Sequence, residues 1–537
     1  MIRTVLSALL LALLPALAAG AGLPSDSETP KHEMRGAWLA TVYGIDWPSR
    51  TGVGEAVAEA QKKELTDILD LLQGAGFNAV FFQTRPMADA FYRSTLEPWS
   101  EFLTGKDPQG EPTWDPLAFA IEECHARGME LHAWVNPFRV SKNEEPRPRR
   151  IASGKGTFNP MEKGWVLTMR DKPAPRSRSK AKGKNRKRRP APAAQPAVMA
   201  ILDPGNPAAR KHVVEVCREI IGKYDVDGLI FDDYFYPDRF PFTPGADPKK
   251  EADQRRENVH QTVREIYAMI QEEKPYVRFG ISPAGVAGGN GKATVKYGLT
   301  PPPVGNDWMY DRIFCDPLPW LDEGTVDYVS PQLYWASNHS TNPYEPLAKW
   351  WSEIAFRFGR HFFSSQNIGA LPAGTPAWKE QGLEVETNRR HNAATHGADI
   401  APSSGHVLYS VSYMTGKKTS GLTDYLAANQ FAHPALMPAM TWKIAPNPGA
   451  LRGLRRDGGV LNWYPHPDMR YVVYAVPDNL SPLDALASSG VNFRPEFVMG
   501  VTYGHEYPIP PSRSSGYWYA VAPYDRYGNE WHPEIIK

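Results

Sequence analysis

Three absences narrow the classes of protein to which this chain of 537 residues can belong. It has only 3 cysteines and no CxxC pair, which excludes a disulfide framework and leaves no sign of structural zinc. Its formal net charge is +1, which excludes a surface built throughout to bind nucleic acid. After the first residues, no apolar run reaches the about 20 residues that span a bilayer. Three buried thiols are predicted, with one disulfide as the alternative, at Cys124, Cys217 and Cys315.

The amino terminus has the three parts of a secretory signal. Arg3 precedes an apolar run, Val5–Leu14, interrupted only by Ser7, and small residues follow as far as Ala21. We expect residues 1–21 to be a signal peptide that is cleaved near Ala18 or Ala21. The mature protein is then periplasmic or secreted, with no transmembrane segment.

One stretch of the chain concentrates the positive charge. Residues 171–190 hold ten Lys or Arg and a single acid, Asp171, so the remainder is mildly acidic. Pro, Ala, Lys and Arg dominate 171–196 without an apolar period, and such a sequence cannot repay its ordering entropy. We predict a disordered basic insertion. It is either a solvated loop or a salt-sensitive contact with an anionic envelope polymer.

Between residues 33 and 437, short apolar runs alternate with amphipathic stretches of helical spacing such as 55–75, 116–128 and 208–223. This alternation predicts a parallel sheet in an α/β fold. Eight runs predict a closed (β/α)8 TIM barrel. The alternative, an open doubly wound sheet, normally has a Gly-rich turn after its first strand, and none follows here. The eight runs are Gly36–Val42, Asn78–Thr84, Glu130–Pro137, Gly228–Asp233, Arg278–Ser282, Asp327–Trp335, His361–Ile368 and His406–Tyr413.

The pattern changes after Pro438. Short runs of alternating character lie between turns rich in Pro, Gly, Asp and Asn, at 458–463, 470–476, 497–503 and 515–523. Residues 438–537 are therefore predicted to form a small β-sandwich. The last run and the residues after it resemble the final strand pair of a fibronectin type III module.

In a (β/α)8 barrel, the carboxyl ends of the strands and the loops after them hold the site. Six of the predicted strand ends bring an acid, an amide or an arginine together with Tyr or Trp. Carboxylates and amides hydrogen-bond sugar hydroxyls, while aromatic faces take the apolar face of a sugar ring. The assortment favours a carbohydrate ligand. No HxH or HExxH pair stands at a strand end, so neither a metal nor a cofactor is predicted.

Two adjacent acids, Asp232 and Asp233, end the fourth predicted strand. Because a strand alternates its faces, an inward Ile230 puts Asp232 in the barrel mouth. Neighbouring carboxylates beside a buried strand suffer desolvation and mutual repulsion, which disfavours a purely structural pair. We predict that Asp232 is a catalytic carboxylate and that Asp233 positions it or contacts substrate. The alternative is that the pair caps the next helix or anchors a loop.

Cleavage of a glycosidic bond needs a second carboxyl group. Asp311 is the first candidate, because the loop after the fifth strand can cross the mouth; an N-cap or a loop acid explains this residue equally well. Asp89 and Glu97, after the second strand, come next.

Residues at other strand ends can each be interpreted in two ways. Arg85, near Asp89, either binds substrate or forms an ion pair that holds its loop. Tyr334 and Trp335 either belong to the core or form a platform for a sugar ring.

Several long motifs, in the same order along the chain, are similar to those of the bacterial glycosyl hydrolase-like 10 family. The resemblance covers about residues 35–430 and implies a TIM-barrel glycoside hydrolase of the cell envelope, in a family associated with bacterial glycans including peptidoglycan strands. A fibronectin-like module after the barrel also fits the family arrangement. The motifs are MRGAWLATV (34–42), FQTRP (82–86), DAFY (89–92), EPWS (97–100), AWVNP (133–137), LDPGNP (202–207), FDDYFYP (231–237) and PQLYW (331–335).

The resemblance also favours particular site residues, and the basic insertion before LDPGNP departs from the family pattern. That departure leaves open the shape of the loop and its reach over substrate. The positions that match the motifs are Gln83, Arg85, Asp89, Asn136, Asp232, Asp233, Gln332 and Tyr334.

These expectations converge on a secreted glycoside hydrolase that cleaves a polymeric envelope glycan, with peptidoglycan strands as the expected substrate. One carboxyl group acts as acid, and another acts as nucleophile or as base for water. The alternative from a different class is a non-catalytic scaffold that only binds envelope glycan. A metal-dependent deacetylase is a third option, and it would lose activity with a chelator.

Overall fold

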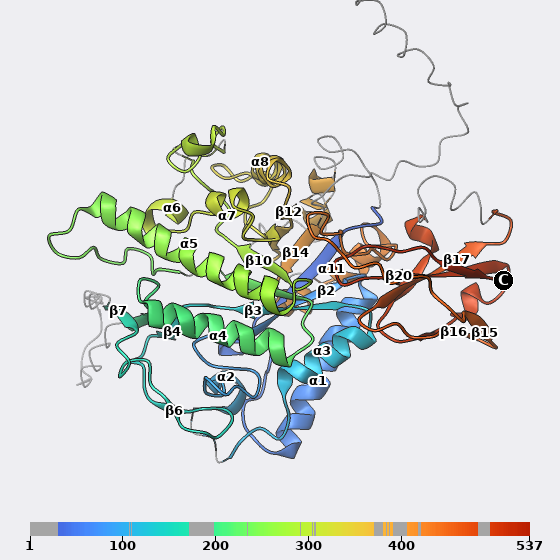
Figure 1. Cartoon of the computed structure of the whole chain (residues 1–537), viewed down its shortest axis with the longest axis horizontal. Coiled ribbons are helices and arrows are strands. Elements are labelled where there is room, and N and C mark those ends of the chain that lie inside the picture. The colour runs from blue at the N-terminus through green and yellow to red at the C-terminus, as the bar shows by residue number, and fades with distance from the viewer. Residues whose placement is uncertain are drawn as a thin grey trace, which may run out of the picture.

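The computed structural model describes residues 30–106, 108, 110–170, 198–232, 235–289, 291–302, 304, 308–369, 380–382, 384–385, 387–389, 405–416, 420–481 and 494–537. An α/β body occupies most of the molecule, and the carboxy-terminal strands lie to one side of it (Figure 1). The predicted signal peptide and the basic insertion fall outside the described residues. Within them, no helix combines the length and the apolar character needed to cross a bilayer.

The α/β body is built on a parallel sheet with the order β12-β11-β10-β9-β3-β2-β1-β14-β13. A single residue separates β12 from β13, so the segment 361–367 pairs with β11 at one end and with β14 at the other. The sheet therefore closes on itself, and the predicted (β/α)8 barrel is confirmed. The strands are β1 (Met34–Leu39), β2 (Ala79–Arg85), β3 (Glu130–Val135), β9 (Gly228–Asp232), β10 (Arg278–Ser282), β11 (Tyr328–Val329), β12 (His361–Phe362), β13 (Ser364–Asn367) and β14 (Gly405–Tyr409).

The eighth strand is shorter than the sequence predicted. The expected strand ran to Tyr413, but β14 ends at Tyr409 and residues 411–414 form helix α10. The cause is a carboxylate from the loop after β1: Asp46 Oδ1 accepts hydrogen bonds from Ser410 Oγ and from Ser412 N, both at 2.8 Å. These bonds bend the chain away from the sheet. Because Asp46 is far from 406–413 in the sequence, no local pattern in that segment predicts the bend.

Helices surround the barrel, and α4 and α5 run side by side along it (Figure 1). Three of the longest begin at an Asp-Pro or Asn-Pro pair. The side chains of Asp115, Asn206 and Asp247 accept hydrogen bonds from the first free N–H groups of α3, α4 and α5, and proline occupies the next position of each. The helices are α1 (Glu55–Gly74), α2 (Glu101–Thr104), α3 (Pro116–Ala126), α4 (Pro207–Lys223), α5 (Pro248–Glu273), α6 (Trp308–Arg312), α7 (Leu318–Asp322), α8 (Tyr344–Arg357), α10 (Val411–Met414) and α11 (Leu422–Ala428).

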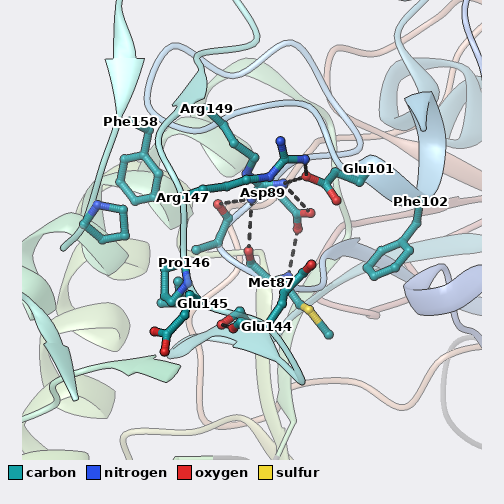
Figure 2. Close-up of a pocket in the computed structure, with 14 residues that line it drawn as sticks. Met87, Asp89, Glu101, Phe102, Glu144, Glu145, Pro146, Arg147, Arg149 and Phe158 are labelled. Carbon is teal, nitrogen blue, oxygen red and sulfur yellow. Dashed lines mark hydrogen bonds and ion pairs between the residues drawn. The ribbon is translucent and has the colours of Figure 1, made fainter. Parts of the chain in front are cut away.

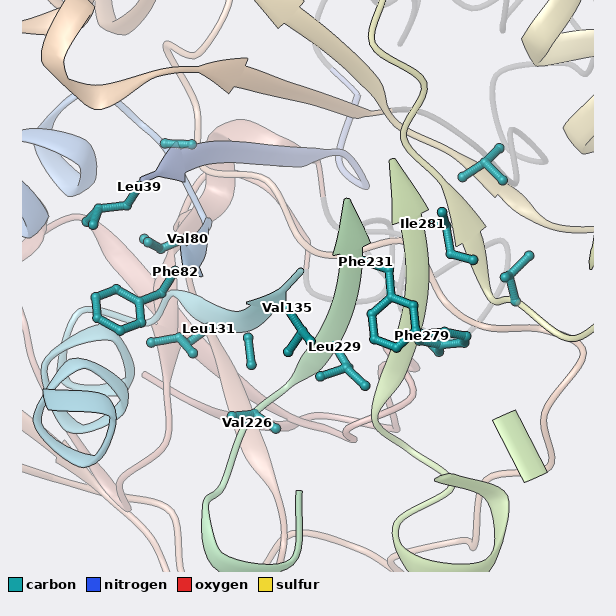
Figure 3. Close-up of a cluster of buried hydrophobic side chains, with 14 of the residues drawn as sticks. Leu39, Val80, Phe82, Leu131, Val135, Val226, Leu229, Phe231, Phe279 and Ile281 are labelled. Carbon is teal, nitrogen blue, oxygen red and sulfur yellow. The ribbon is translucent and has the colours of Figure 1, made fainter. Parts of the chain in front are cut away.

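Alternate residues of the barrel strands enter two different cores. Leu229 and Phe231 point outward into the layer between strands and helices (Figure 3). Ile230 points inward, where it packs with Trp38 and Trp134, whose ring centroids are 4.7 Å apart. Burial of each large apolar side chain stabilises the fold by about 1.5–3 kcal/mol. The outer core also holds the three cysteines, which are buried and form no disulfide, as predicted.

The segment after β3 contains a small antiparallel sheet that the periodicity of the sequence did not predict. Its order is β4-β8-β7, with β4 (Arg139–Lys142), β8 (Val198–Leu202) and β7 (Val166–Arg170). A hairpin of β5 (Arg149–Arg150) and β6 (Thr157–Phe158) lies between them. Strand β8 begins at Val198.

The carboxy-terminal residues form two antiparallel sheets, so this part of the chain is all-β. Their detailed match to a fibronectin type III module stays a prediction. One sheet has the order β15-β16-β19, with β15 (Arg455–Asp457), β16 (Val460–Asn462) and β19 (Glu506–Pro508). The other has the order β18-β17-β20-β21, with β18 (Val498–Thr502), β17 (Arg470–Pro477), β20 (Tyr517–Tyr524) and β21 (Glu534–Ile536).

Strand β17 serves two cores at once. Tyr471 and Val473 face the interior between the two carboxy-terminal sheets. Val472 and Tyr474 join the same apolar cluster as Ile230 in the barrel interior. The four-stranded sheet therefore covers the end of the barrel at which the strands begin, and it leaves the opposite end, where the strands finish, free for a site.

Buried charges fasten this sheet to the amino-terminal ends of the barrel strands. Arg470 Nη1 lies 2.5 Å from Oε1 of Glu130, the first residue of β3. Arg526 Nη2 and the Tyr503 hydroxyl each lie 3.0 Å from Asp227 Oδ1, just before β9. When two opposite charges are both buried, removing one leaves the other unpaired in the interior, which strongly destabilises the fold. The carboxy-terminal sheets therefore contribute to the stability of the barrel.

Candidate active site

Asp232 lies at the carboxyl end of β9, in the mouth of the barrel, with 8% of its surface exposed. Its neighbour two residues earlier, Ile230, points into the barrel interior, so strand alternation turns Asp232 to the same side. Asp233, the second acid of the pair, lies outside the described residues.

A chain of amides leads from the end of β1 to this carboxylate. Gln83 Oε1 accepts hydrogen bonds from the backbone N–H groups of Thr41 and Val42, at 2.9 and 2.8 Å. Its Nε2 therefore donates to Asn136 Oδ1 at 2.8 Å, and Asn136 Nδ2 donates to Asp232 Oδ2 at 2.9 Å. Because a backbone N–H can only donate, the orientation of both amides is fixed. Asn136 thus presents a donor to Asp232 and holds its carboxyl group in one orientation.

Two further groups reach Asp232 from other strands. Gln332 Nε2, after β11, lies 3.3 Å from Asp232 Oδ1. The guanidinium of Arg139, the first residue of β4, lies 4.0 Å from Oδ2. The structure thus brings together Gln83, Asn136, Asp232 and Gln332, four of the residues that the sequence singled out. Arg139 was not predicted to be a site residue. It follows the third predicted strand, but nothing in the neighbouring sequence indicates the direction in which its side chain points.

We expect Asn136→Ala to lower kcat/KM on glycan about 100-fold, because Asp232 loses a fixed donor and its rotamer is no longer held. Gln83 also loses its acceptor, so thermal unfolding should be measured beside the kinetics. Asn136→Asp keeps an acceptor for Gln83 but sets a second negative charge against Asp232, and its activity should be equally low. An Asn136→Ala enzyme that folds and retains full kcat/KM would show that the amide chain has no role in turnover.

Aromatic side chains form one wall of the mouth. The rings of Tyr334, in the loop after β11, and Tyr409, the last residue of β14, have centroids 5.8 Å apart. Burial and, to a smaller extent, the charges of Asp46 and Asp232 together raise the pKa of Tyr409 to about 12. Trp335 is partly buried against the outer core and lies over Gly285, where a Cβ would come within 2.6 Å of its ring. Tyr334 and Tyr409 are thus better placed than Trp335 to meet a sugar.

Asp46 is a second carboxyl group near the mouth. Its Oδ2 accepts a hydrogen bond from Ala40 N at 2.7 Å, and its Oδ1 holds the turn after β14. Burial raises its pKa despite these donors. Asp46 and Asp232 both lie close enough to the Tyr409 hydroxyl for their charges to act on it. The sequence placed Asp46 at a strand end but did not single it out, because its partners lie far along the chain.

Arg85 lies behind the mouth in an ion pair with a partner other than the one predicted. Its Nε and Nη2 donate to the two carboxylate oxygens of Glu97 at 2.7 and 2.6 Å, and both side chains are fully buried. Nη1 donates to the carbonyl oxygen of Asn136 at 2.6 Å. Arg85 thereby fixes the backbone of Asn136 and acts as a positioning residue, out of reach of solvent.

Arg85 and His212 hold the pKa of Glu97 at about 2, well below its usual range, against the effect of burial. The folded-state pKa is lowered, so this pair stabilises the fold above about pH 4.5, and its contribution is lost as the pH falls through 2. The lost contribution is about 3 kcal/mol. We expect Glu97→Gln to be less stable than the wild type at pH 7 and to lose about 3 kcal/mol less between pH 5 and pH 2, as measured by denaturant unfolding. Glu59→Gln, an exposed control, should follow the wild type.

The remaining predicted acids lie apart from Asp232. Asp311, in α6, is 40% exposed and pairs with Lys292 Nζ at 2.8 Å. Asp89 is buried beside the loop after β2, where it accepts a hydrogen bond from Met87 N at 2.8 Å, and burial raises its pKa. Neither contact joins these acids to the amide chain.

Asp316, in the loop before α7, is a buried carboxyl group whose pKa desolvation raises to about 7. Its described contacts belong to the helix layer: Leu318 N donates to Oδ1 at 3.3 Å, and the His260 ring lies 3.3 Å from its carbonyl oxygen. The perturbed pKa alone therefore does not make it part of the mouth. In the described part of the chain, no group of three or more His, Cys, Asp or Glu side chains is arranged to hold a metal ion.

Comparison with known proteins agrees with this geometry. Residues 33–374 match the glycosyl hydrolase-like 10 family. The chain is 32% identical over 462 residues to the glycosyl hydrolase YngK of Bacillus subtilis (strain 168). The matched region covers 81% of this chain and 80% of YngK. The chain is 31% identical over 437 residues to the glycosyl hydrolase DigH of Escherichia coli (strain K12), covering 76% and 90%. These relatives support a glycosidase-type activity on a glycan. The chain belongs to the glycosyl hydrolase-like 10 family.

Proposed function

We propose that this protein is a secreted glycoside hydrolase that cleaves a polymeric glycan of the bacterial envelope, with peptidoglycan strands as substrate. The observation that carries the proposal is the pair of oriented amide donors on Asp232, which hold a carboxylate at the open end of a barrel beside Tyr334 and Tyr409. A negative charge fixed beside aromatic faces suits the oxocarbenium-like transition state of glycoside cleavage.

Two carboxyl groups in different environments have different roles in the proposed reaction. Asp232 is held in place by two amide donors and lies near Arg139, so it serves as the nucleophile or as the base for water. Asp46, the other carboxyl group whose charge acts on the Tyr409 hydroxyl, is our candidate for the acid that protonates the leaving glycosidic oxygen, and burial raises its pKa. The bond from the anomeric carbon to that oxygen breaks, and water provides the hydroxyl group of the new reducing end. Asp46 thus replaces Asp311 as our candidate for the acid.

The envelope substrate rests on two features of the sequence. The amino-terminal signal pattern sends the protein out of the cytoplasm, and the resemblance described above belongs to enzymes of envelope glycans. Secretion is tested directly by comparing the amino-terminal residue of the mature protein with a cut after Ala18 or Ala21.

The activity is tested by digesting purified sacculi, with and without stem peptides, and identifying soluble products by mass spectrometry. We expect new reducing ends in equal number to the bonds cut, and no loss of activity with a chelator. Sedimentation of the protein with sacculi that release no fragment would favour a glycan-binding scaffold. Release of acetate without chain cleavage, sensitive to chelator, would favour a deacetylase.

A further inference from the structure

A pocket lies beside the mouth, between the loop after β2 and the small sheet that follows β3 (Figure 2). Apolar side chains, including Phe102 and Phe158, share its walls with charged groups. Each acid in the lining has a cationic partner. Arg149 Nη1 lies 3.5 Å from Asp89 Oδ2 and 3.8 Å from Glu101 Oε1. Glu144 and Glu145 pair with Lys106 and Arg170, which lie outside the lining. Such a pocket offers many hydrogen-bonding groups and apolar surface with little net field, which suits an uncharged polyhydroxy ligand.

Tyr43 stands next to this pocket, on the turn that follows β1. Its ring packs edge-on against Phe102 with centroids 5.0 Å apart, yet 53% of its surface is exposed. Its φ of 57° lies in the left-handed region, which is strained for a bulky side chain. Ala88, which lines the pocket, has a φ of 47°. Strain of this kind persists where the surroundings impose it, and it gathers at ligand sites.

The short strand β4 connects this pocket to the proposed catalytic carboxylate. Its first residue, Arg139, lies 4.0 Å from Asp232, and its next two residues, Val140 and Ser141, line the pocket. Arg139 and Glu144 also lie close enough to Tyr43 for their charges to act on its hydroxyl, in opposite directions. A chain that leaves the mouth past Arg139 therefore meets the open face of Tyr43 before it reaches the pocket.

We propose that Tyr43 and this pocket form a second sugar-binding subsite, which holds a further unit of the glycan chain while Asp232 acts on the bond in the mouth. The apolar face of the sugar stacks on Tyr43, and its hydroxyl groups enter the pocket beyond Phe102. This subsite rests on the proposed function, and it makes the protein an enzyme of polymers: affinity rises with chain length once the glycan reaches past β4.

The test uses the full chain carrying Asp232→Asn, so that glycans of defined length bind without being cut. Calorimetry gives the ratio of Kd for a two-sugar fragment to Kd for a fragment of six sugars. Tyr43→Asn removes the ring and still tolerates the left-handed backbone, so the loop keeps its shape. We expect this variant to reduce the ratio about tenfold, while Tyr43→Phe, which keeps the ring, retains it.

Tyr464→Ala is the matched control, because this residue is 66% exposed on the carboxy-terminal sheets and its loss should leave the ratio unchanged. An unchanged ratio in Tyr43→Asn, with thermal unfolding as in the parent protein, would overturn the subsite. Failure of the proposed function is read separately: if a protein with Asp232→Asn as its only change still cuts sacculi, the catalytic assignment falls. The effect of Tyr43→Asn is then measured as the ratio of kcat/KM for the six-sugar and two-sugar fragments in the wild-type background, and an unchanged ratio would still overturn the subsite.

Discussion

Replacing Asp232 with asparagine is expected to abolish glycan cleavage, with kcat at least about 10³-fold lower and the fold intact. The amide has nearly the same shape but no negative charge with which to attack the anomeric carbon, activate water or stabilise the developing cation. It offers one acceptor oxygen in place of two, so one of the donors from Asn136 and Gln332 is left unmatched. The cost in stability is about 1 kcal/mol. Release of reducing ends from sacculi measures the loss, and turnover near that of the wild type would refute the role.

Two companion variants assign the acid. Asp46→Asn should lower kcat and remove the descending limb of the pH profile at high pH, because the proton donor is gone. Asp311→Asn should change kcat/KM less than twofold, since this acid forms an exposed ion pair with Lys292. A loss in Asp311→Asn as large as that in Asp46→Asn would return the acid role to Asp311.

Arg470→Met is expected to be the most destabilising single change, at about 3–5 kcal/mol in the free energy of unfolding. Arg470 holds the pKa of Glu130 at about 2, and Arg470 Nη2 also donates to the carbonyl oxygen of Asp525 at 2.7 Å. Without it, Glu130 stays 3% exposed with its nearest other guanidinium, that of Arg278, 3.8 Å away. Denaturant unfolding at pH 7 measures the effect.

The double variant Arg470→Met with Glu130→Gln should recover part of this loss, because no unpaired charge is then left in the interior. Arg455→Met, on the same carboxy-terminal sheets but 52% exposed, should cost less than about 0.5 kcal/mol. If Arg470→Met costs no more than Arg455→Met, the carboxy-terminal sheets are an attached module that contributes nothing to the barrel.

The sequence predicted the barrel because the signals for it are local. Strand and helix patterns alternate along the chain, and Asp-Pro or Asn-Pro pairs start α3, α4 and α5. The direction of Asp232 was also predictable, since it follows from the two-residue period of a strand whose Ile230 is buried. Neither inference requires knowledge of which residue lies across the barrel.

The amino-acid sequence by itself determined the fold class and which edge of the sheet carries polar groups, because periodicity and strand ends are written in neighbouring residues. Only the tertiary structure decided which of those groups meet. Closure of the barrel places Gln83 within hydrogen-bond distance of Asn136, and Asn136 within hydrogen-bond distance of Asp232. It also brings Arg85 into an ion pair with Glu97. It also sets the carboxy-terminal sheet over the amino-terminal end of the barrel. Contacts between residues so far apart depend on strand register and on the packing of the whole chain, which no local pattern encodes.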